Sequence, residues 1–232
     1  YIQDALPLSP SVRLLILSAG TDEQKQSGQP WHIQSFADLC NCPPLPVQHR
    51  PYRSSCDFAQ IIYTSGTTGK PKGVVLRHAN LRANTTSIVS YLDLQPSDRV
   101  MAVLPFFYSY GNSILLTHVA VGGSLVVNQS FLYPNTILQQ MVDHEVTGFS
   151  GVPSTYALLL NRSAIASFSF PKLRYLTQAG AAMSPELARR LKAIFPASRI
   201  FIMYGQTEAC ARLAYLPPEE IERKPGSIGK GI

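Results

Sequence analysis

Residues 63–73, with the sequence Tyr-Thr-Ser-Gly-Thr-Thr-Gly-Lys-Pro-Lys-Gly, combine the residue types that bind phosphate. The three glycines leave the backbone free to take positive φ, so that consecutive N–H groups can approach the oxygen atoms of an anion. Lys70 and Lys72 supply mobile positive charge, and Pro71 fixes one torsion between them. Short hydroxyl donors come from Thr64, Ser65, Thr67 and Thr68. This composition predicts a phosphate-binding loop.

A surface turn rich in glycine and threonine is the competing interpretation of the same stretch. The stretch matches neither of the two best-known phosphate-binding motifs. The Walker pattern fails because Gly69-Lys70 is followed by Pro71 rather than by a serine or threonine, and the spacing G-x-G-x-x-G is absent. The functional interpretation therefore depends on what the rest of the chain places beside the loop.

From Arg99 onward, short β-rich runs alternate with helical stretches. A helix start is indicated at Ser184-Pro185-Glu186, which offers a cap, a proline at the first helical position and an acid in the first turn. The strands predicted in this part are 99–104, 124–128, 147–152, 173–177 and 199–203. Such alternation predicts an α/β fold with a doubly wound, mainly parallel sheet and helices on both faces.

Earlier in the chain, residues 12–17 form an apolar run that predicts a buried strand. Residues 73–76 predict a strand that returns from the glycine-rich loop, and residues 80–92 predict the helix after it. Arg77 stands where that helix begins and cannot cap it as a serine or threonine would, because its side chain has no acceptor.

In open α/β sheets, ligands bind beyond the carboxyl ends of the strands. Three segments of unusual composition follow predicted strands: Pro105–Gly111, Gln178–Met183 and Tyr204–Glu208. Taken singly, each has a structural explanation, since aromatic clusters are often core and Gly-Ala-Ala permits close packing. We expect the three to lie along one edge of the sheet.

Together with the loop at 63–73, and in this order, these segments resemble the adenylate-forming superfamily. It includes acyl-CoA synthetases, firefly-type luciferases and the adenylation domains of peptide synthetases. The resemblance implies that residues 58–232 are the ATP- and acyl-binding core of the large N-terminal domain and that residues 1–57 are a partial segment of that domain. No counterpart of the small C-terminal lid domain is present, so we expect this stretch to be poor or inactive at adenylation alone.

The resemblance also implies a role for individual residues. Phosphate-binding positions are Thr64, Ser65, Gly66, Thr67, Thr68, Gly69 and Lys70. Adenine-binding positions are Gly180, Ala181, Ala182, Tyr204 and Gly205. Thr207 would contact the α-phosphate, Glu208 would bind Mg²⁺, and Lys70 and Lys72 would offset charge on the leaving pyrophosphate; these four are the implied catalytic residues. Many members have a polar residue at the position of Ile202, where it binds the adenine amino group. Isoleucine cannot make that contact, so here only backbone carbonyls could accept from the amino group.

The aromatic segment resembles the superfamily motif that lines the acyl pocket. The implied pocket residues are Phe107, Tyr108, Ser109, Tyr110 and Gly111. Amino-acid-activating relatives place an aspartate just after this motif, whereas Gly111-Asn112-Ser113 offers no carboxylate. A buried ammonium group without a partner is costly, so we expect a fatty or aromatic carboxylic acid without an α-amino group.

The implied reaction converts such an acid and Mg-ATP to an acyl-adenylate and pyrophosphate. The acyl group then passes to the thiol of CoA or of the phosphopantetheine arm on an acyl carrier protein. Three alternatives stay open: a non-catalytic nucleotide-binding or regulatory module, an amino-acid-activating adenylation domain, and a luciferase-like oxidative use of the adenylate.

The composition argues against several other functions, namely nucleic-acid binding, a membrane span and a zinc site. The formal charge of +6 comes without a dense lysine and arginine run, and only 15% of residues are charged, so nucleic-acid binding is not expected. No long uncharged apolar stretch predicts a membrane span. The four cysteines lack the spacing of a zinc site. We expect free thiols in a reducing compartment, and from that a cytoplasmic protein.

Overall fold

The computed structural model describes residues 14–17, 32–35, 54–64, 71–128 and 130–232. The chain divides into two compact units, residues 1–52 and 53–232. In the first unit, β1 (Leu14–Leu17) and β2 (His32–Ser35) pair in parallel. A strand is thus present within the predicted span 12–17.

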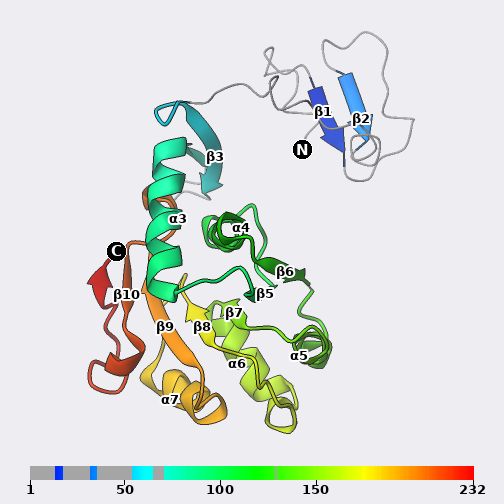
Figure 1. The fold of residues 1–232 in the computed structure, drawn as a ribbon, viewed down its shortest axis with the longest axis vertical. Helices are drawn as coiled ribbons and strands as arrows, with labels where there is room; N and C mark the ends of the chain where they lie inside the picture. Colours follow the sequence, from blue (N-terminus) through cyan, green and yellow to red (C-terminus); the bar gives the residue numbers. More distant parts are fainter. Residues whose placement is uncertain (1–13, 18–31, 36–53, 65–70, 129) are drawn as a thin grey trace. The chain divides into compact units, whose positions relative to one another are not determined.

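The second unit is built on a seven-stranded sheet with the order β11-β10-β9-β8-β7-β5-β6 (Figure 1). Five neighbouring strands, from β6 to β9, are parallel, and β10 and β11 add an antiparallel edge. The strands are β5 (Arg99–Ala102), β6 (Ser124–Val127), β7 (Gly148–Gly151), β8 (Tyr175–Gln178), β9 (Arg199–Tyr204), β10 (Ala214–Leu216) and β11 (Lys230–Gly231). The predicted mainly parallel sheet is confirmed, with strand ends shifted by one or two residues.

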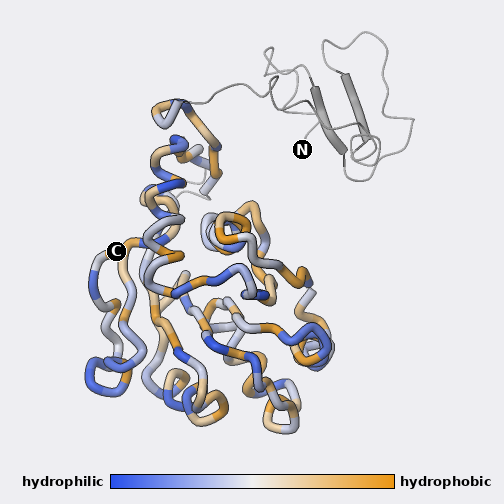
Figure 2. Tube along the Cα trace, in the orientation of Figure 1, coloured by the Kyte–Doolittle hydropathy of each residue, from blue (hydrophilic) through white to orange (hydrophobic). Residues whose placement is uncertain are grey.

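Helices cover both faces of this sheet (Figure 1). One face packs on α5 (Pro134–Asp143), α6 (Pro153–Arg162) and α7 (Pro185–Ile194), and the other on α3 (His78–Leu92) and α4 (Ser109–Val121). Strand β9, nearly all apolar (Figure 2), sends Ile200 and Ile202 to the first face and Phe201 and Met203 to the second. None of the helices described is long and apolar enough to cross a membrane.

Three short 3₁₀ helices complete the described elements: η4 (Ile165–Ser167), η5 (Thr207–Ala209) and η6 (Pro218–Glu220). A separate antiparallel hairpin consists of β3 (Phe58–Thr64) and β4 (Lys72–Arg77). This hairpin leads directly into α3, against which both of its strands pack. The glycine-rich loop predicted to bind phosphate therefore connects the two strands of a hairpin.

The helix starts follow from local hydrogen bonds. At α7 the Leu187 N–H donates to the Ser184 hydroxyl oxygen at 3.1 Å, which confirms the predicted cap. At α3 the Arg77 side chain has no acceptor to offer; instead the Arg77 N–H donates to Asn80 Oδ1 at 2.9 Å. The reciprocal half of a capping box thus replaces the missing cap at Arg77.

An almost fully buried carboxylate, Asp98, joins three strands on the side opposite their carboxyl ends. Arg174 donates to both of its oxygens, with Nη2 at 2.7 Å from Oδ2, and Thr147 Oγ1 donates to Oδ1 at 2.7 Å. Burial acts to raise the pKa of Asp98, but the hydrogen bonds from Arg174, Thr147 and the Gln95 N–H hold it below its ordinary value. The carboxylate stays charged and fastens β5 to the residues that precede β7 and β8.

Replacing Arg174 with methionine should destabilise the second unit by about 2 kcal/mol near neutral pH, because a buried carboxylate loses its cation while the partly exposed site admits some water. A carboxylate with a lowered pKa contributes stability that disappears as the pH falls, so the deficit should shrink in acid. Urea unfolding at several pH values measures both effects. Arg190→Met, which removes an exposed contact to Asn161, is the control and should change stability by less than about 0.5 kcal/mol. Equal losses for the two variants would contradict the assignment.

Candidate active site

The three segments of unusual composition follow β5, β8 and β9, which are parallel, and so lie at the same edge of the sheet. Two of them touch: the hydroxyl groups of Ser109, at the start of α4, and Thr207, in η5, are 3.3 Å apart. The structure thereby joins a predicted acyl-pocket residue to a predicted phosphate-binding residue.

A group of buried hydroxyls holds the aromatic segment against the centre of the sheet. The Tyr110 hydroxyl donates to the Thr177 carbonyl oxygen and lies 2.9 Å from both it and the Thr177 hydroxyl. Tyr156 donates to the same carbonyl at 2.7 Å, and Ser150 Oγ lies 2.8 Å from Thr177 Oγ1. Burial raises the pKa of Tyr110 to about 12, so the phenol is neutral at physiological pH. Tyr110 acts here as an anchor.

Four of the five predicted adenine-binding residues are open to solvent, and Gly205 is half-buried. Gly180, which adopts φ +91°, and the two alanines after it are exposed, as is the ring of Tyr204 at 43%. The Gln178 side chain, buried at the end of β8, donates from Nε2 to the Ala181 carbonyl oxygen at 2.7 Å and so fixes this turn from below. Small side chains on one segment and an exposed aromatic ring on the next suit the binding of a flat base.

A close backbone contact shapes the turn after β9. A Cβ atom at Gly205 would lie 1.5 Å from the Ala211 carbonyl oxygen, so only glycine fits. The chain reverses direction at Cys210 and Ala211, whose φ angles are +60° and +88°. The short helix η5 lies within this reversal, between Gly205 and Ala211. In η5, Glu208 is exposed and Thr207 is half-buried.

The predicted phosphate loop is described only at its ends. Thr64 and Lys72 are cross-strand partners in the hairpin, and the Thr64 hydroxyl donates to the Lys72 carbonyl oxygen at 3.4 Å. The Lys72 side chain is exposed. Ser65, Gly66, Thr67, Thr68, Gly69 and Lys70 lie outside the described residues.

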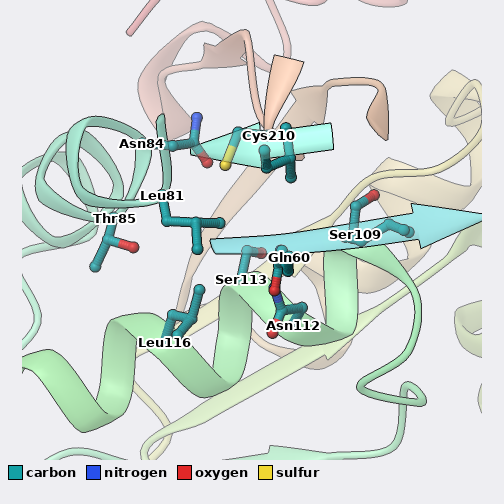
Figure 3. Close-up of a pocket in the computed structure, with 11 residues that line it drawn as sticks. Gln60, Leu81, Asn84, Thr85, Ser109, Asn112, Ser113, Leu116 and Cys210 are labelled. Carbon is teal, nitrogen blue, oxygen red and sulfur yellow. The ribbon is translucent and has the colours of Figure 1, made fainter. Parts of the chain in front are cut away.

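The predicted acyl-pocket residues separate into three groups. Phe107 and Tyr108 are mostly exposed, and their rings contact each other with centroids 4.4 Å apart. Gly111 is buried in α4, where an added Cβ would lie 2.1 Å from the Pro105 carbonyl oxygen, so glycine permits this close packing. Ser109 lines a cavity of about 10 Å³ between β3, α3 and α4 (Figure 3).

Several residues around this cavity were missed by the sequence analysis. Polar side chains converge on it from separate elements: Gln60 from β3, Asn84 from α3, Asn112 from α4 and Cys210 from the turn after η5 (Figure 3). Asn112 Nδ2 donates to Gln60 Oε1 at 3.1 Å. The helical spacing of Leu81, Asn84 and Thr85 could have indicated one shared face, but nothing in the sequence says which face meets the site.

The predicted metal site has a single carboxylate, that of Glu208. No cluster of three or more His, Cys, Asp or Glu side chains that could hold a metal ion is found among the residues with a described position. A divalent cation at Glu208 would therefore depend on oxygen atoms of a bound phosphate, as is usual for Mg²⁺.

A doubly wound sheet with this edge and hairpin has the fold of the N-terminal domain of adenylate-forming enzymes. Comparison with known proteins agrees with that class. The sequence matches the family described as "AMP-binding enzyme" over residues 4–232. The chain therefore belongs to the AMP-binding enzyme family.

Named relatives and solved structures are similar to the chain over most of its length. Oxalate–CoA ligase from Saccharomyces cerevisiae is 34% identical over 80% of the chain and 34% of that protein. Sulfoacetate–CoA ligase from Cupriavidus necator is 37% identical over 83% of the chain and 38% of that protein. The structure of O-succinylbenzoate coenzyme A synthetase from Bacillus subtilis, in complex with ATP and magnesium ion, superposes with a TM-score of 0.81 and 26% identity, covering all of this chain and 48% of that one. The chain thus spans about a third to a half of these relatives.

Replacing Gly205 with alanine should destabilise the second unit by about 1–3 kcal/mol, because the new methyl group cannot coexist with the Ala211 carbonyl oxygen. Gly231→Ala is the matched control: its added Cβ meets only a carbonyl oxygen at 3.9 Å, and we expect a change within about 0.5 kcal/mol. Urea unfolding monitored by circular dichroism compares the two. A stable Gly205→Ala protein would show that the turn is not under this constraint.

Proposed function

We propose that the full-length protein carrying this chain activates a carboxylic acid with ATP and transfers the acyl group to a thiol. Residues 58–232 would supply the ATP- and acyl-binding core, with residues 1–57 belonging to the same domain. A carboxylate oxygen of the acid attacks the α-phosphorus, the bond to pyrophosphate breaks, and the thiol then displaces AMP from the acyl-adenylate. Membership of the AMP-binding enzyme family and the CoA-ligase names of the relatives support this proposal.

The single observation that carries the proposal is the contact between Ser109 and Thr207. It brings the segment assigned to the acid and the segment assigned to the α-phosphate within hydrogen-bonding distance. The two reacting groups of an adenylation must meet at such a place, because much of the catalysis comes from holding them in contact.

The proposed nucleotide contacts lie on either side of this point. Tyr204 and the exposed turn Gly180–Ala182 would hold the adenine, and Thr207 would donate to the α-phosphate. Lys72, together with the phosphate-loop residues 64–70, would offset the negative charge of the leaving pyrophosphate.

The proposed magnesium position is Glu208. Its side chain is exposed at the sheet edge, and a single carboxylate fits a cation that takes most of its remaining ligands from phosphate and water. When bound, Mg²⁺ supplies charge neutralisation on the phosphates. The similar structure of O-succinylbenzoate coenzyme A synthetase from Bacillus subtilis contains ATP and magnesium ion, which supports a role for magnesium in general.

The proposed acceptor is CoA, since the relatives named above act as CoA ligases. A phosphopantetheine arm on an acyl carrier protein presents the same thiol and is the second candidate acceptor. Side-by-side assays with CoA and with a carrier protein would separate them.

The acid is proposed to lack an α-amino group. The two polar residues after the aromatic segment are already engaged, Asn112 with Gln60 and Ser113 with the Tyr110 carbonyl oxygen, and neither is acidic. An ammonium group would have no anionic partner there. The relatives named above act on oxalate, sulfoacetate and O-succinylbenzoate, and so favour small organic acids. A long-chain-fatty-acid–CoA ligase from Archaeoglobus fulgidus is also similar in structure, so a fatty acid stays among the candidates.

Carboxylate-dependent exchange of labelled pyrophosphate into ATP tests the proposal in the full-length protein. Glu208→Gln should lower the exchange rate by about 100-fold or more, because the phosphates lose their metal ligand in the transition state. The exposed position of Glu208 means that unfolding temperature should stay unchanged.

The matched control is Glu219→Gln, an exposed carboxylate in η6, which should leave exchange within about twofold of the wild type. ATP binding without exchange for any acid would overturn the ligase proposal and favour a non-catalytic nucleotide-binding module. Exchange with amino acids alone would instead favour an amino-acid-activating domain.

A further inference from the structure

A buried arginine stands immediately beyond the turn that carries Thr207 and Glu208. Arg212 is 2% exposed, and its guanidinium lies between α3 and α4. Nη1 donates to the Tyr91 hydroxyl at 3.0 Å, and Cζ lies 5.2 Å from the centre of the Tyr110 ring. Nε is buried without a hydrogen-bond partner among the described residues.

No anion balances this charge in the part of the chain that the structure describes. The ion pairs found there join Asp98 to Arg174, Glu186 to Arg189, and Glu220 to Arg223 and Lys224. Tyr110 and Tyr175 do not supply an anion, because burial raises the pKa of Tyr110 to about 12 and also raises the pKa of Tyr175. A buried cation without an anion is strongly unfavourable, so a negative group supplied from outside would be bound tightly.

Arg212 also shares a cavity with the proposed metal ligand. A cavity of about 320 Å³ is lined by Glu208, Cys210, Arg212 and Asn84, among others. It adjoins the smaller cavity of Figure 3, with which it has Asn84 and Cys210 in common. Asn84 Nδ2 donates to the Arg212 carbonyl oxygen at 2.7 Å and so fixes the backbone of Arg212 beside α3.

We propose that Arg212 binds a second anionic group of the substrate, so that the acid activated at Thr207 and Glu208 is a short acid with a carboxylate or sulfonate at its far end. The inference rests on the proposed function and names the substrate class of that same site. A guanidinium presents paired donors that match the two oxygens of such a group, and Nε is one of those donors.

The dimensions of the site favour a short molecule. The arginine and the reacting end are linked by direct contacts, from Thr207 to Ser109 and from Tyr110 to Arg212. The cavity that Arg212 borders has a volume of about 320 Å³, which is room for an acid of a few carbons. The space between β3, α3 and α4 amounts to only about 10 Å³ and would not take a long acyl chain.

A purely structural role for Arg212 makes a different prediction. As a cation packed between Tyr91 and Tyr110, it would join α3 to α4. Its removal would then lower the activity toward every acid together with the unfolding temperature. A role in recognition changes the preference between acids of equal size.

The test uses pyrophosphate exchange by the full-length protein with matched pairs of acids: malonate against propanoate and succinate against butanoate. The wild type should favour the dianionic member of at least one pair by about 30-fold or more in kcat/KM, the usual effect of a buried charge partner. Equal rates with both members of each pair would overturn the inference while leaving the ligase proposal intact.

Arg212→Met should abolish that preference, because kcat/KM with the dianion falls by at least about 30-fold more than kcat/KM with the monoanion of the same size. Arg212→Lys should retain part of the preference, because a point charge replaces the paired donors. Arg82→Met, which removes an exposed arginine of α3, is the control and should alter neither. Parallel loss with both acids in Arg212→Met and Arg212→Lys would assign a structural role instead.

A binding measurement keeps the test independent of catalysis. Without ATP, succinate should raise the unfolding temperature of the wild type above the value in butanoate at equal ionic strength, and Arg212→Lys should show a smaller rise. Absence of pyrophosphate exchange with all acids would count against the ligase proposal. Absence of a succinate-specific rise would count against a second anion site.

Discussion

The arrangement of the site depends on the hydrogen bonds made by the carbonyl oxygen and the hydroxyl group of Thr177, at the centre of the sheet. Its carbonyl oxygen receives both Tyr110 and Tyr156, and its hydroxyl meets those of Tyr110 and Ser150. These contacts join α4, α6, β7 and β8 at one fully buried residue, directly before the turn 178–183. A shift of β8 would carry the proposed adenine turn away from the aromatic segment. Because each buried polar group needs a partner, the network admits one arrangement of these elements and so fixes the distance between the two halves of the site.

The described part of the chain satisfies almost all of its buried polar side-chain atoms, and the exceptions are informative. They are Gln60 Nε2, Gln178 Oε1 and Arg212 Nε. Each belongs to a residue that borders the proposed site: Gln60 lines the cavity of Figure 3, Gln178 supports the turn 180–182, and Arg212 borders the larger cavity. Elsewhere the polar groups in the described core have hydrogen-bond partners. Asp98 accepts from Arg174, and the ring nitrogens of His118 are hydrogen-bonded to the Tyr175 hydroxyl and the Ile114 carbonyl oxygen. Unpartnered donors and acceptors therefore gather where a ligand could complete them.

The sequence predicted the sheet and the three segments at its edge well, because strand periodicity and helix caps are local properties. The strands β5 to β9 and the cap at Ser184 appear where their patterns indicated, within a residue or two. It could not predict the cavity residues Gln60, Asn84 and Cys210, since these come together only when α3 packs beside α4 and the turn after η5 closes. At Gly111 the structure adds a reason for glycine that the motif did not supply, since a Cβ there would meet the Pro105 carbonyl oxygen; its place in an acyl pocket stays a prediction. The assigned roles of the phosphate-loop residues 65–70 remain predictions.

The two halves of the proposed site differ in how specificity would be encoded. The nucleotide half consists of backbone atoms, glycine, alanine and one aromatic ring. The shape of such a surface is set by the backbone conformation, and a short sequence motif can specify that conformation. The acid half consists of large side chains from three elements, Asn84 in α3, Tyr110 in α4 and Arg212 before β10, each with its own neighbours. A change at Asn84 or Arg212 alters size or charge away from the strand ends, whereas Tyr110 also bonds Thr177 in β8. Substrate choice can therefore vary within a fixed nucleotide site, and the charge at Arg212 is the feature of this chain that would direct that choice toward anionic acids.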